Sequence, residues 1–430
     1  MRVILVGVKI GEDADFEHTM EELGNLAEAC GKTPVGIVTQ NLEQVSQTYY
    51  VGSGKVDEIK ELAGFQEAEE IIFDDTLTPS QARNLGNRIE KTILDRTSLI
   101  LEIFAMRAKT KEAKLQVEMA RLQYMLPRLI GMREALGRQG GTSGAMSSKG
   151  AGETKLELDR RKIEHRISEL RKELETLSGN RATMRSRRDA SGIPKVALVG
   201  YTNAGKSTIM NRRVAGFGTQ KDKTVLEKDM LFATLDTSVR SMEFPDHRRF
   251  LLADTVGFIH KLPHSLVKAF RSTLEEVKYA DLLVHVVDFS DEHHKQQMEV
   301  TQETLRELDA AGIPQLIVYN KADLAGTDEY PRIHENQIYM AAAQDCGIEE
   351  LAGMIRDRLY AENRICRFLF PYKNGSEASE LMRDSDVREK EYVPEGVVLL
   401  ASCGKRQREK FRKYLVEEEK CDILSKRSEV

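Results

Sequence analysis

Apolar and polar positions follow the same rhythm in two parts of the chain. Short apolar runs with the length of buried strands alternate with stretches of helical spacing in residues 1–106 and in residues 195–360. This alternation predicts an α/β fold in both parts, and in the second a doubly wound, mostly parallel sheet with ligands at the carboxyl ends of its strands. The predicted strands are residues 3–8, 35–38, 71–73, 196–199, 249–253, 282–287 and 315–319.

Residues 107–180 have a different pattern, with two apolar seams of heptad spacing. A Gly/Ser-rich segment, residues 137–152, separates the seams and contains six glycines. Two seams joined by one flexible loop predict an antiparallel helical hairpin in which each seam covers the other. The seams consist of Leu115, Met119, Leu122, Leu126 and Leu129, and of Ile163, Ile167, Leu170, Leu174 and Leu177.

The remaining segments predict a linker and a small terminal domain. Residues 181–194 form a basic linker that ends in Gly192-Ile193-Pro194. The tail contains two strand-like runs and a charged stretch, 405–420, that we expect to be helical. The predicted order is an N-terminal α/β domain (1–106), the hairpin (107–180), the linker, a P-loop domain (195–360) and a small α/β domain (361–430).

Composition and charge narrow the possible partners. The chain is 40% apolar and 31% charged, and no stretch has the length and apolarity of a membrane span. Five scattered cysteines predict reduced thiols in a cytoplasmic protein, which we expect to be a monomer when free. The formal net charge is −5, yet residues 107–188 contain 20 Lys or Arg against 10 Asp or Glu. Such a basic segment fits either a polyanionic partner or a solvated helical surface.

The most specific chemistry lies in residues 200–207, which read Gly-Tyr-Thr-Asn-Ala-Gly-Lys-Ser. This G-x-x-x-x-G-K-S sequence follows an apolar run and precedes a predicted helix, which is the context of a phosphate-binding P-loop. Backbone N–H groups of the loop and the positive N-terminus of the helix can hold phosphate oxygens. Lys206 adds a charge at the β- and γ-phosphates, and the Ser207 hydroxyl can ligate Mg²⁺.

A second motif, Asp254-Thr255-Val256-Gly257, follows the predicted strand 249–253. An Asp at the end of a strand beside a P-loop holds Mg²⁺, often through water. The Gly257 N–H can bind the γ-phosphate, so this turn can respond to the presence of that phosphate.

A third motif, Asn320-Lys321-Ala322-Asp323, follows the strand 315–319 and predicts the base. The Asp323 carboxylate can accept hydrogen bonds from guanine N1–H and the 2-amino group, a donor pair that adenine lacks. Asn320 would brace the P-loop and guanine N7, and the Lys321 stem would cover the ring. The predicted substrate is therefore GTP.

A threonine is expected to complete the Mg²⁺ shell in the triphosphate state. Thr234 is the best candidate, with Thr224 and Thr237 as alternatives. The predicted catalytic residues are Lys206, Thr234 and Gly257, and the predicted metal ligands are Ser207, Thr234 and Asp254. The predicted nucleotide-binding residues are Gly200, Tyr201, Thr202, Asn203, Ala204, Gly205, Lys206, Ser207, Thr208, Phe232, Ala233, Thr234, Asp254, Thr255, Val256, Gly257, Asn320, Lys321, Asp323, Ala341 and Ala342.

Phe258 follows the second motif at the position where Ras-like switches have a Gln that orients the attacking water. A phenyl ring cannot do this. We therefore expect slow hydrolysis by the protein alone and a partner that orders the switch segments. A simple packing role for Phe258 is compatible with this expectation.

These motifs resemble those of the HflX family of ribosome-associated GTPases, within the translation-factor-related P-loop class. The resemblance covers about residues 1–360 and is carried by residues 49–60, 111–129, 152–161, 200–207, 231–236, 254–267, 270–277 and 320–323. It implies binding to the large ribosomal subunit and its ribosomal RNA, and GTP hydrolysis stimulated by that subunit. It also implies a role in splitting stalled ribosomes or in dormancy, with the glycine-rich loop reaching toward the peptidyl-transferase region.

Some positions depart from the family pattern. Residues 140–152 differ from the usual loop sequence, Arg213 occupies a position that is normally apolar, and Ala341 replaces an expected serine. The backbone N–H of Ala342 could still reach guanine O6. Asn203 resembles the P-loop asparagine of K⁺-stimulated GTPases, which makes K⁺ a possible cofactor beside Mg²⁺. Two alternative functions stay open: a GTP-gated ribosome or RNA assembly factor, and a non-catalytic ribosome-binding scaffold.

Overall fold

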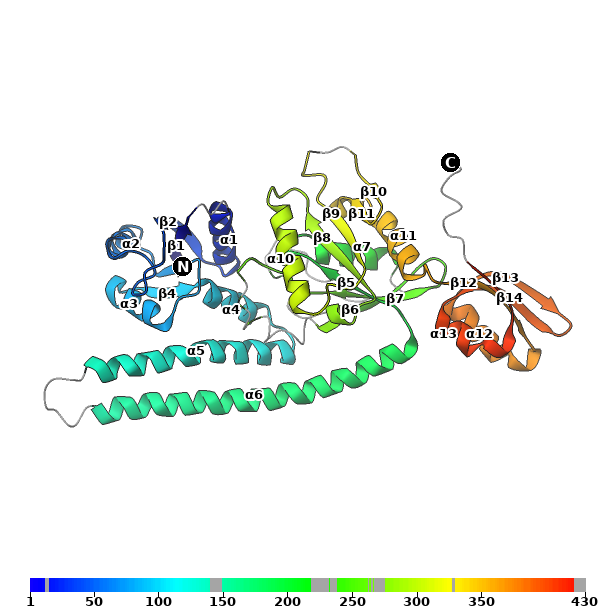
Figure 1. Ribbon diagram of the computed structural model, residues 1–430, viewed down its shortest axis with the longest axis horizontal. Helices are drawn as coiled ribbons and strands as arrows, with labels where there is room; N and C mark the ends of the chain where they lie inside the picture. Colours follow the sequence, from blue (N-terminus) through cyan, green and yellow to red (C-terminus); the bar gives the residue numbers. More distant parts are fainter. Residues whose placement is uncertain are drawn as a thin grey trace. The chain divides into compact units, whose positions relative to one another are not determined.

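The computed structural model describes residues 1–11, 15–139, 149–217, 232, 238–261, 263, 266, 275–326 and 329–420 (Figure 1). Contacts divide the chain into two compact units. The first comprises Met1–Ala182, Asp229–Asp236 and Ile259–Thr273. The second comprises Thr183–Lys228, Thr237–Phe258 and Leu274–Val430.

The first unit contains a four-stranded, wholly parallel sheet in the order β2-β1-β3-β4. Its helices connect successive strands, as parallel pairing requires. The core is formed by apolar side chains of β1 and β3 together with those of α2 and α3. The elements are β1 (Arg2–Ile10), α1 (Phe16–Ala29), β2 (Thr33–Leu42), α2 (Ser53–Phe65), β3 (Glu70–Phe73), α3 (Pro79–Ile89), β4 (Thr92–Asp95) and α4 (Arg96–Arg107).

Residues 52–55, Gly-Ser-Gly-Lys, form the start of α2. In the structure Ser53 begins the helix, and the Gly52 N–H donates to Gln40 Oε1 at 2.9 Å. Lys55 forms an ion pair within the helix, with Glu58 at 2.7 Å. These contacts are those of a helix start.

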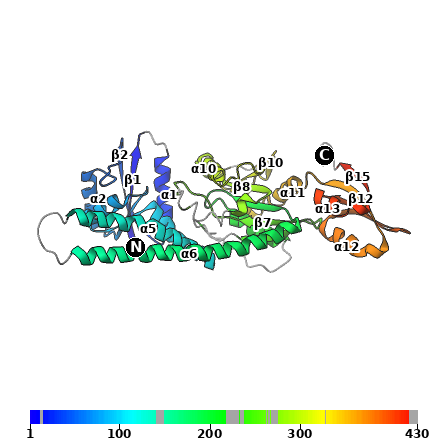
Figure 2. The same cartoon turned by 60° about the horizontal axis from the view of Figure 1, so that its bottom comes forward.

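The hairpin consists of α5 (Lys111–Gln139) and α6 (Lys149–Ser191), which lie side by side in both views (Figures 1 and 2). Arg166 of α6 pairs with Glu118 of α5 at 2.8 Å, and Lys111 pairs with Glu173 at 3.7 Å. This order of pairs is antiparallel. Leu115, Ile167 and Leu170 of the predicted seams are buried.

The two helices of the hairpin extend beyond their predicted bounds. Helix α5 continues to Gln139, and α6 begins at Lys149 and continues to Ser191, so most of the segment predicted as a linker (181–194) is helical. Residues 181–191 contain Ala, Met and Arg, which favour helices, and no Gly or Pro before Gly192. The tip of the predicted loop, residues 140–148, lies outside the described residues.

The second unit is built on a seven-stranded sheet in the order β10-β11-β9-β8-β5-β7-β6. Strands β11, β9, β8, β5 and β7 pair in parallel, and β6 and β10 pair antiparallel at the two edges. This is the predicted doubly wound, mostly parallel fold, and it places the ends of β5, β7 and β9 along one edge. The strands are β5 (Lys195–Val199), β6 (Ser238–Glu243), β7 (Arg249–Asp254), β8 (Leu282–Asp288), β9 (Gln315–Asn320), β10 (Arg332–His334) and β11 (Gln337–Tyr339).

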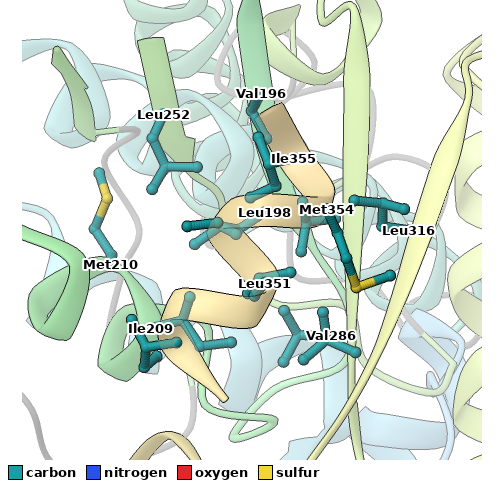
Figure 3. Close-up of a cluster of buried hydrophobic side chains, with 14 of the residues drawn as sticks. Val196, Leu198, Ile209, Met210, Leu252, Val286, Leu316, Leu351, Met354 and Ile355 are labelled. Carbon is teal, nitrogen blue, oxygen red and sulfur yellow. The ribbon is translucent and has the colours of Figure 1, made fainter. Parts of the chain in front are cut away.

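Apolar side chains from this sheet interlock with two helices to form the core of the second unit (Figure 3). Val196, Leu198 and Val286 meet Ile209 and Met210 of α7, and Leu351 and Ile355 of α11. This packing holds the strand ends that carry the three motifs. The helices are α7 (Lys206–Phe217), α9 (Glu275–Lys278), α10 (His294–Glu307) and α11 (Ile348–Leu359), with a 3₁₀ turn η1 (Ala342–Gln344).

A four-stranded antiparallel sheet follows, in the order β13-β14-β12-β15. The predicted helix over residues 405–420 was wrong in its second half. Helix α13 (Lys405–Lys410) is short, and β15 (Leu415–Lys420) pairs with β12, where Arg364 holds Glu418 at 2.9 Å. The strand is thus stabilised by long-range pairing that its local sequence does not signal. The other elements are β12 (Arg364–Phe370), α12 (Gly375–Asp384), β13 (Asp386–Val393) and β14 (Gly396–Cys403).

Candidate functional site

The P-loop joins β5 to α7 and depends on two glycines. Gly200 has φ +142°, and a Cβ there would lie 2.1 Å from the Val286 carbonyl oxygen. Gly205 has φ +94°, and a Cβ there would lie 2.1 Å from Asn320 Nδ2. Both positions therefore exclude a side chain, and the loop can close over an anion with its backbone N–H groups.

Lys206 begins α7 and is buried. Its ammonium donates to the carbonyl oxygens of Gly200 at 3.0 Å and Tyr201 at 2.6 Å. Burial lowers the pKa of Lys206 from 10.5 to about 8, and the nearby Asp254 carboxylate opposes the shift. The two carbonyl oxygens thus hold the Lys206 ammonium at the P-loop, and a phosphate oxygen can replace them as its acceptor.

Ser207 and Asp254 meet although they lie 47 residues apart. The Ser207 hydroxyl donates to Asp254 Oδ2 at 2.8 Å, and Asp254 is fully buried at the end of β7. A hydroxyl and a carboxylate oxygen side by side are the hard oxygen donors that Mg²⁺ prefers, so these residues fit the predicted metal. Bound there, Mg²⁺ would neutralise charge on the β- and γ-phosphates.

The turn after β7 is attached to the P-loop. Thr255 Oγ1 donates to the Leu198 carbonyl at 2.6 Å, and a Cβ on Gly257 would lie 2.8 Å from Thr202 Cα. The backbone of Phe258 pairs with the P-loop, because its N–H donates to the Gly200 carbonyl and its carbonyl accepts from the Thr202 N–H. The Phe258 side chain is 1% exposed. It fills the core and presents no polar group to a water molecule.

The third motif is connected to the same loop. The Asn320 amide donates to the Ala204 carbonyl at 2.9 Å and accepts from the Ala342 N–H at 3.0 Å. The Ala342 N–H, predicted to reach guanine O6, therefore has a protein acceptor in the structure. Asp323 is half-buried and accepts from Gln344 Nε2 at 3.2 Å. Asn320 thus joins three predicted nucleotide-binding segments.

Two residues at the site were missed in the sequence. Asp288 ends β8 and holds the Lys321 ammonium at 2.7 Å, which fixes the stem predicted to cover the base. The feature of the sequence that could have identified Asp288 is an acidic residue at the end of a buried strand. That strand, β8, pairs with β9, which carries the third motif. His285 is 1% exposed, and burial, with the charge of Lys206, lowers its pKa from 6.5 to about 4. No sequence pattern indicated this neutral histidine.

Other predicted residues are placed elsewhere or lie beyond the description. Phe232 is buried, and its ring packs edge to face on Phe104 of α4 at 4.8 Å, so its contact with nucleotide stays a prediction. Ala233, Thr234 and the alternatives Thr224 and Thr237 lie outside the described residues, as does the side chain of Arg213.

The pKa of Lys206 predicts how nucleotide affinity depends on pH. Phosphate stabilises the protonated amine, so binding above the free pKa requires proton uptake. GDP affinity should be almost constant below about pH 7 and fall about tenfold between pH 7 and pH 9. Titration calorimetry across this range tests the expectation. A Lys206→Arg variant keeps its charge and should show weak but pH-independent binding; a flat profile for the unmodified protein would contradict the assignment.

Models of three protein families match consecutive parts of the chain. They are described as GTP-binding GTPase N-terminal (residues 17–105), GTP-binding GTPase Middle Region (107–188) and 50S ribosome-binding GTPase (195–321). A protein named GTPase HflX from Caldanaerobacter subterraneus subsp. tengcongensis is 41% identical over 415 residues, which cover 96% of this chain and 94% of the relative. GTPase HflX from Escherichia coli is 38% identical, covering 92% and 91% of the two chains.

A GTP-binding protein from Sulfolobus solfataricus, with a crystal structure in complex with GDP, is 25% identical in sequence to this chain. The match covers 83% of this chain and 98% of that protein's chain, with a TM-score of 0.43.

The parallel sheet, the P-loop and the matched family models define a P-loop GTPase, an enzyme that binds and hydrolyses GTP. The chain belongs to the HflX family, which confirms the resemblance noted in its motifs. None of the described helices is both long and apolar enough to cross a membrane.

Proposed function

We propose that this GTPase acts on ribosomes in the cytoplasm and that the large ribosomal subunit and its RNA stimulate its GTP hydrolysis. We also propose that it acts in ribosome splitting and rescue or in dormancy. The observation that carries the need for a partner is the burial of Phe258 at the position of a water-orienting side chain. Lys206, Ser207 and Asp254 lie where they can hold phosphate and Mg²⁺, whereas Phe258, the described residue at the water-orienting position, offers no polar side chain. The matched description of a 50S ribosome-binding GTPase supports the large subunit as that partner.

The residues have the following proposed roles. Lys206 and the P-loop backbone hold the phosphates, Ser207, Asp254 and Thr234 hold Mg²⁺, and Gly257 senses the γ-phosphate. Asn320, Lys321 and Asp323 hold guanine. We also infer that residues 1–106, the hairpin, residues 195–360 and residues 361–430 act as separate domains.

Sedimentation of ribosomes distinguishes splitting from the alternative of an assembly factor. Intact ribosomes incubated with the protein and GTP should separate into subunits. A Lys206→Ala variant, which removes the phosphate-binding charge, is the matched control and should leave them joined. If ribosome peaks stay intact with the unmodified protein at saturating GTP, splitting is excluded. GTP-dependent binding without separation would instead favour the assembly factor.

Monovalent cations provide a second test of the phosphate site. Asn203 lies exposed in the P-loop with φ +60°, where its side chain can help to hold K⁺ beside the phosphates. A cation at that place stabilises charge that develops during hydrolysis. Basal hydrolysis should be about tenfold faster in K⁺ than in Na⁺ at equal ionic strength. An Asn203→Ala variant should lose the difference, and equal rates in the two salts with the unmodified protein would refute the role of K⁺.

A further inference from the structure

The second unit contains a cavity of about 740 Å³ away from the P-loop. Its walls come from the segment before β5, the start of β7, the end of α11, helix α12 and helix α13. None of the residues in its walls belongs to the three nucleotide motifs. The cavity therefore needs an explanation separate from GTP.

The charges in the cavity walls are predominantly positive. Among the described residues, six cationic side chains and the two carboxylates Glu362 and Glu380 line it, although the whole chain has a net charge of −5. The cations are Arg248, Arg249, Arg383, Lys405, Arg406 and Lys410. Such a local excess of positive charge attracts anions, and phosphate groups above all.

Carboxylates of the protein hold some of these cations. Arg248 pairs with Asp246, Arg249 with Glu243 at 3.1 Å, and Lys410 with Glu380. Lys405 is exposed, and the described residues include no ion-pair partner for it. Lys405 and its neighbour Arg406 are both exposed at the cavity, where a ligand from solvent can reach them.

The chain before β5 is shaped to admit Arg406. Gly192 has φ +71°, and a Cβ there would lie 2.5 Å from Arg406 Nη1. A residue other than glycine at position 192 would strain the backbone at this positive φ, and the end of the Arg406 side chain would have to shift. The end of the Arg406 side chain thus lies beside the Gly192 backbone at the cavity wall.

The cavity is amphipathic as well as basic. Leu381 and Phe411 are buried in its walls, and Ile193, Pro194 and Leu359 are half-buried there, whereas Lys405 and Arg406 are exposed. The guanidinium carbon of Arg248 lies 4.6 Å from the centroid of the Tyr360 ring, and this stacked pair forms a flat part of the cavity wall. Apolar walls beside exposed cations suit a nucleotide unit, because the base can leave water while its phosphate stays at the charges.

We propose that this cavity binds a nucleotide of single-stranded RNA, with the phosphates at Lys405 and Arg406. The proposal rests on the proposed function, which brings the protein to a particle rich in RNA. It assigns an RNA-binding role to the C-terminal part of the chain.

Binding of a fluorescein-labelled single-stranded RNA, followed by anisotropy with GDP saturating the P-loop, tests the proposal on the full chain. The Lys405→Glu/Arg406→Glu variant should bind at least about tenfold more weakly, and the slope of log affinity against log salt should fall by about 1.4 for two lost phosphate contacts. The matched control, Lys373→Glu/Lys390→Glu, makes the same charge change at exposed positions of the same sheet domain outside the cavity. It should weaken binding by less than about threefold, through long-range electrostatics alone.

Further measurements keep the outcomes distinct. Lys405→Glu alone changes a side chain without an ion pair and should lower the salt slope by about 0.7 with basal GTP hydrolysis unchanged. Equal RNA affinity for the cavity variant and its matched control overturns the proposal. Displacement of the RNA by AMP or GMP at equal molar concentration also overturns it, because the cavity would then be a mononucleotide site. If large subunits stimulate GTP hydrolysis by the unmodified protein but both double variants bind RNA with equal affinity, the RNA-binding cavity is refuted and the proposed function stands. If large subunits do not stimulate GTP hydrolysis, the proposed function is refuted.

Discussion

An Asp323→Asn variant should bind GTP more weakly and xanthosine triphosphate more tightly than the unmodified protein does. The carboxylate can accept two hydrogen bonds from guanine, and each hydrogen bond to a charged group contributes about 1.5–3 kcal/mol. Their loss should weaken GTP binding by about 10² to 10⁴-fold. Xanthine has a carbonyl in place of the 2-amino group, so the Asn amide can donate to it while its oxygen accepts from N1–H.

Competition between labelled GDP and unlabelled guanine or xanthine nucleotides measures this change of selectivity. Asp345→Asn is the matched control, because Asp345 lies near the same loop, is 61% exposed and pairs with Arg212 at 2.9 Å. It should leave the base preference unchanged. If Asp323→Asn binds GDP as tightly as the unmodified protein, Asp323 does not hold the base.

An Arg96→Ala variant should strongly destabilise the first unit. Arg96 is 1% exposed and pairs with Asp74 at 2.6 Å and with Glu22, both of which are buried. Asp74 also pairs with Lys261 at 2.6 Å. Removal of the guanidinium breaks both buried ion pairs and leaves Lys261 as the cation beside Asp74, which costs about 3–5 kcal/mol.

Amide hydrogen exchange of β1, β3 and β4 in the full chain measures this cost in the first unit. Arg88→Ala is the control, because its pair with Asp57 is exposed, with side chains 35% and 54% accessible. Loss of an exposed pair should cost less than about 1 kcal/mol. Similar effects of the two substitutions would show that the buried cluster is not a source of stability.

The α/β class could be predicted from the sequence because its signals are local, and the P-loop shows this most clearly. A short apolar run, a glycine loop and a helix are local in the chain, and β5 ends at Val199 while α7 begins at Lys206. The ends of β7 and β9 were predicted at the same edge because parallel strands share their direction. Ser207 and Asp254 accordingly meet at 2.8 Å.

Contacts between distant segments could not be predicted in the same way. The Ala342 N–H donates to Asn320 because a turn after β11 meets the end of β9, and neither local sequence specifies that geometry. Strand β15 has a charged, helix-like sequence and is held by pairing with β12. The local sequence does not distinguish Arg96 from a surface arginine. Its buried position follows from the fold, which places Glu22 and Asp74 beside it.

The central claim is that this GTPase depends on the large ribosomal subunit for fast hydrolysis, because Phe258 is buried and cannot orient water. The most direct test is the rate of phosphate release at saturating GTP with and without purified large subunits, with small subunits as the control. The account predicts slow release by the protein alone and an increase of at least about 10²-fold with large subunits, the scale of one ordered transition-state group. An unchanged rate at saturating large subunits would contradict it.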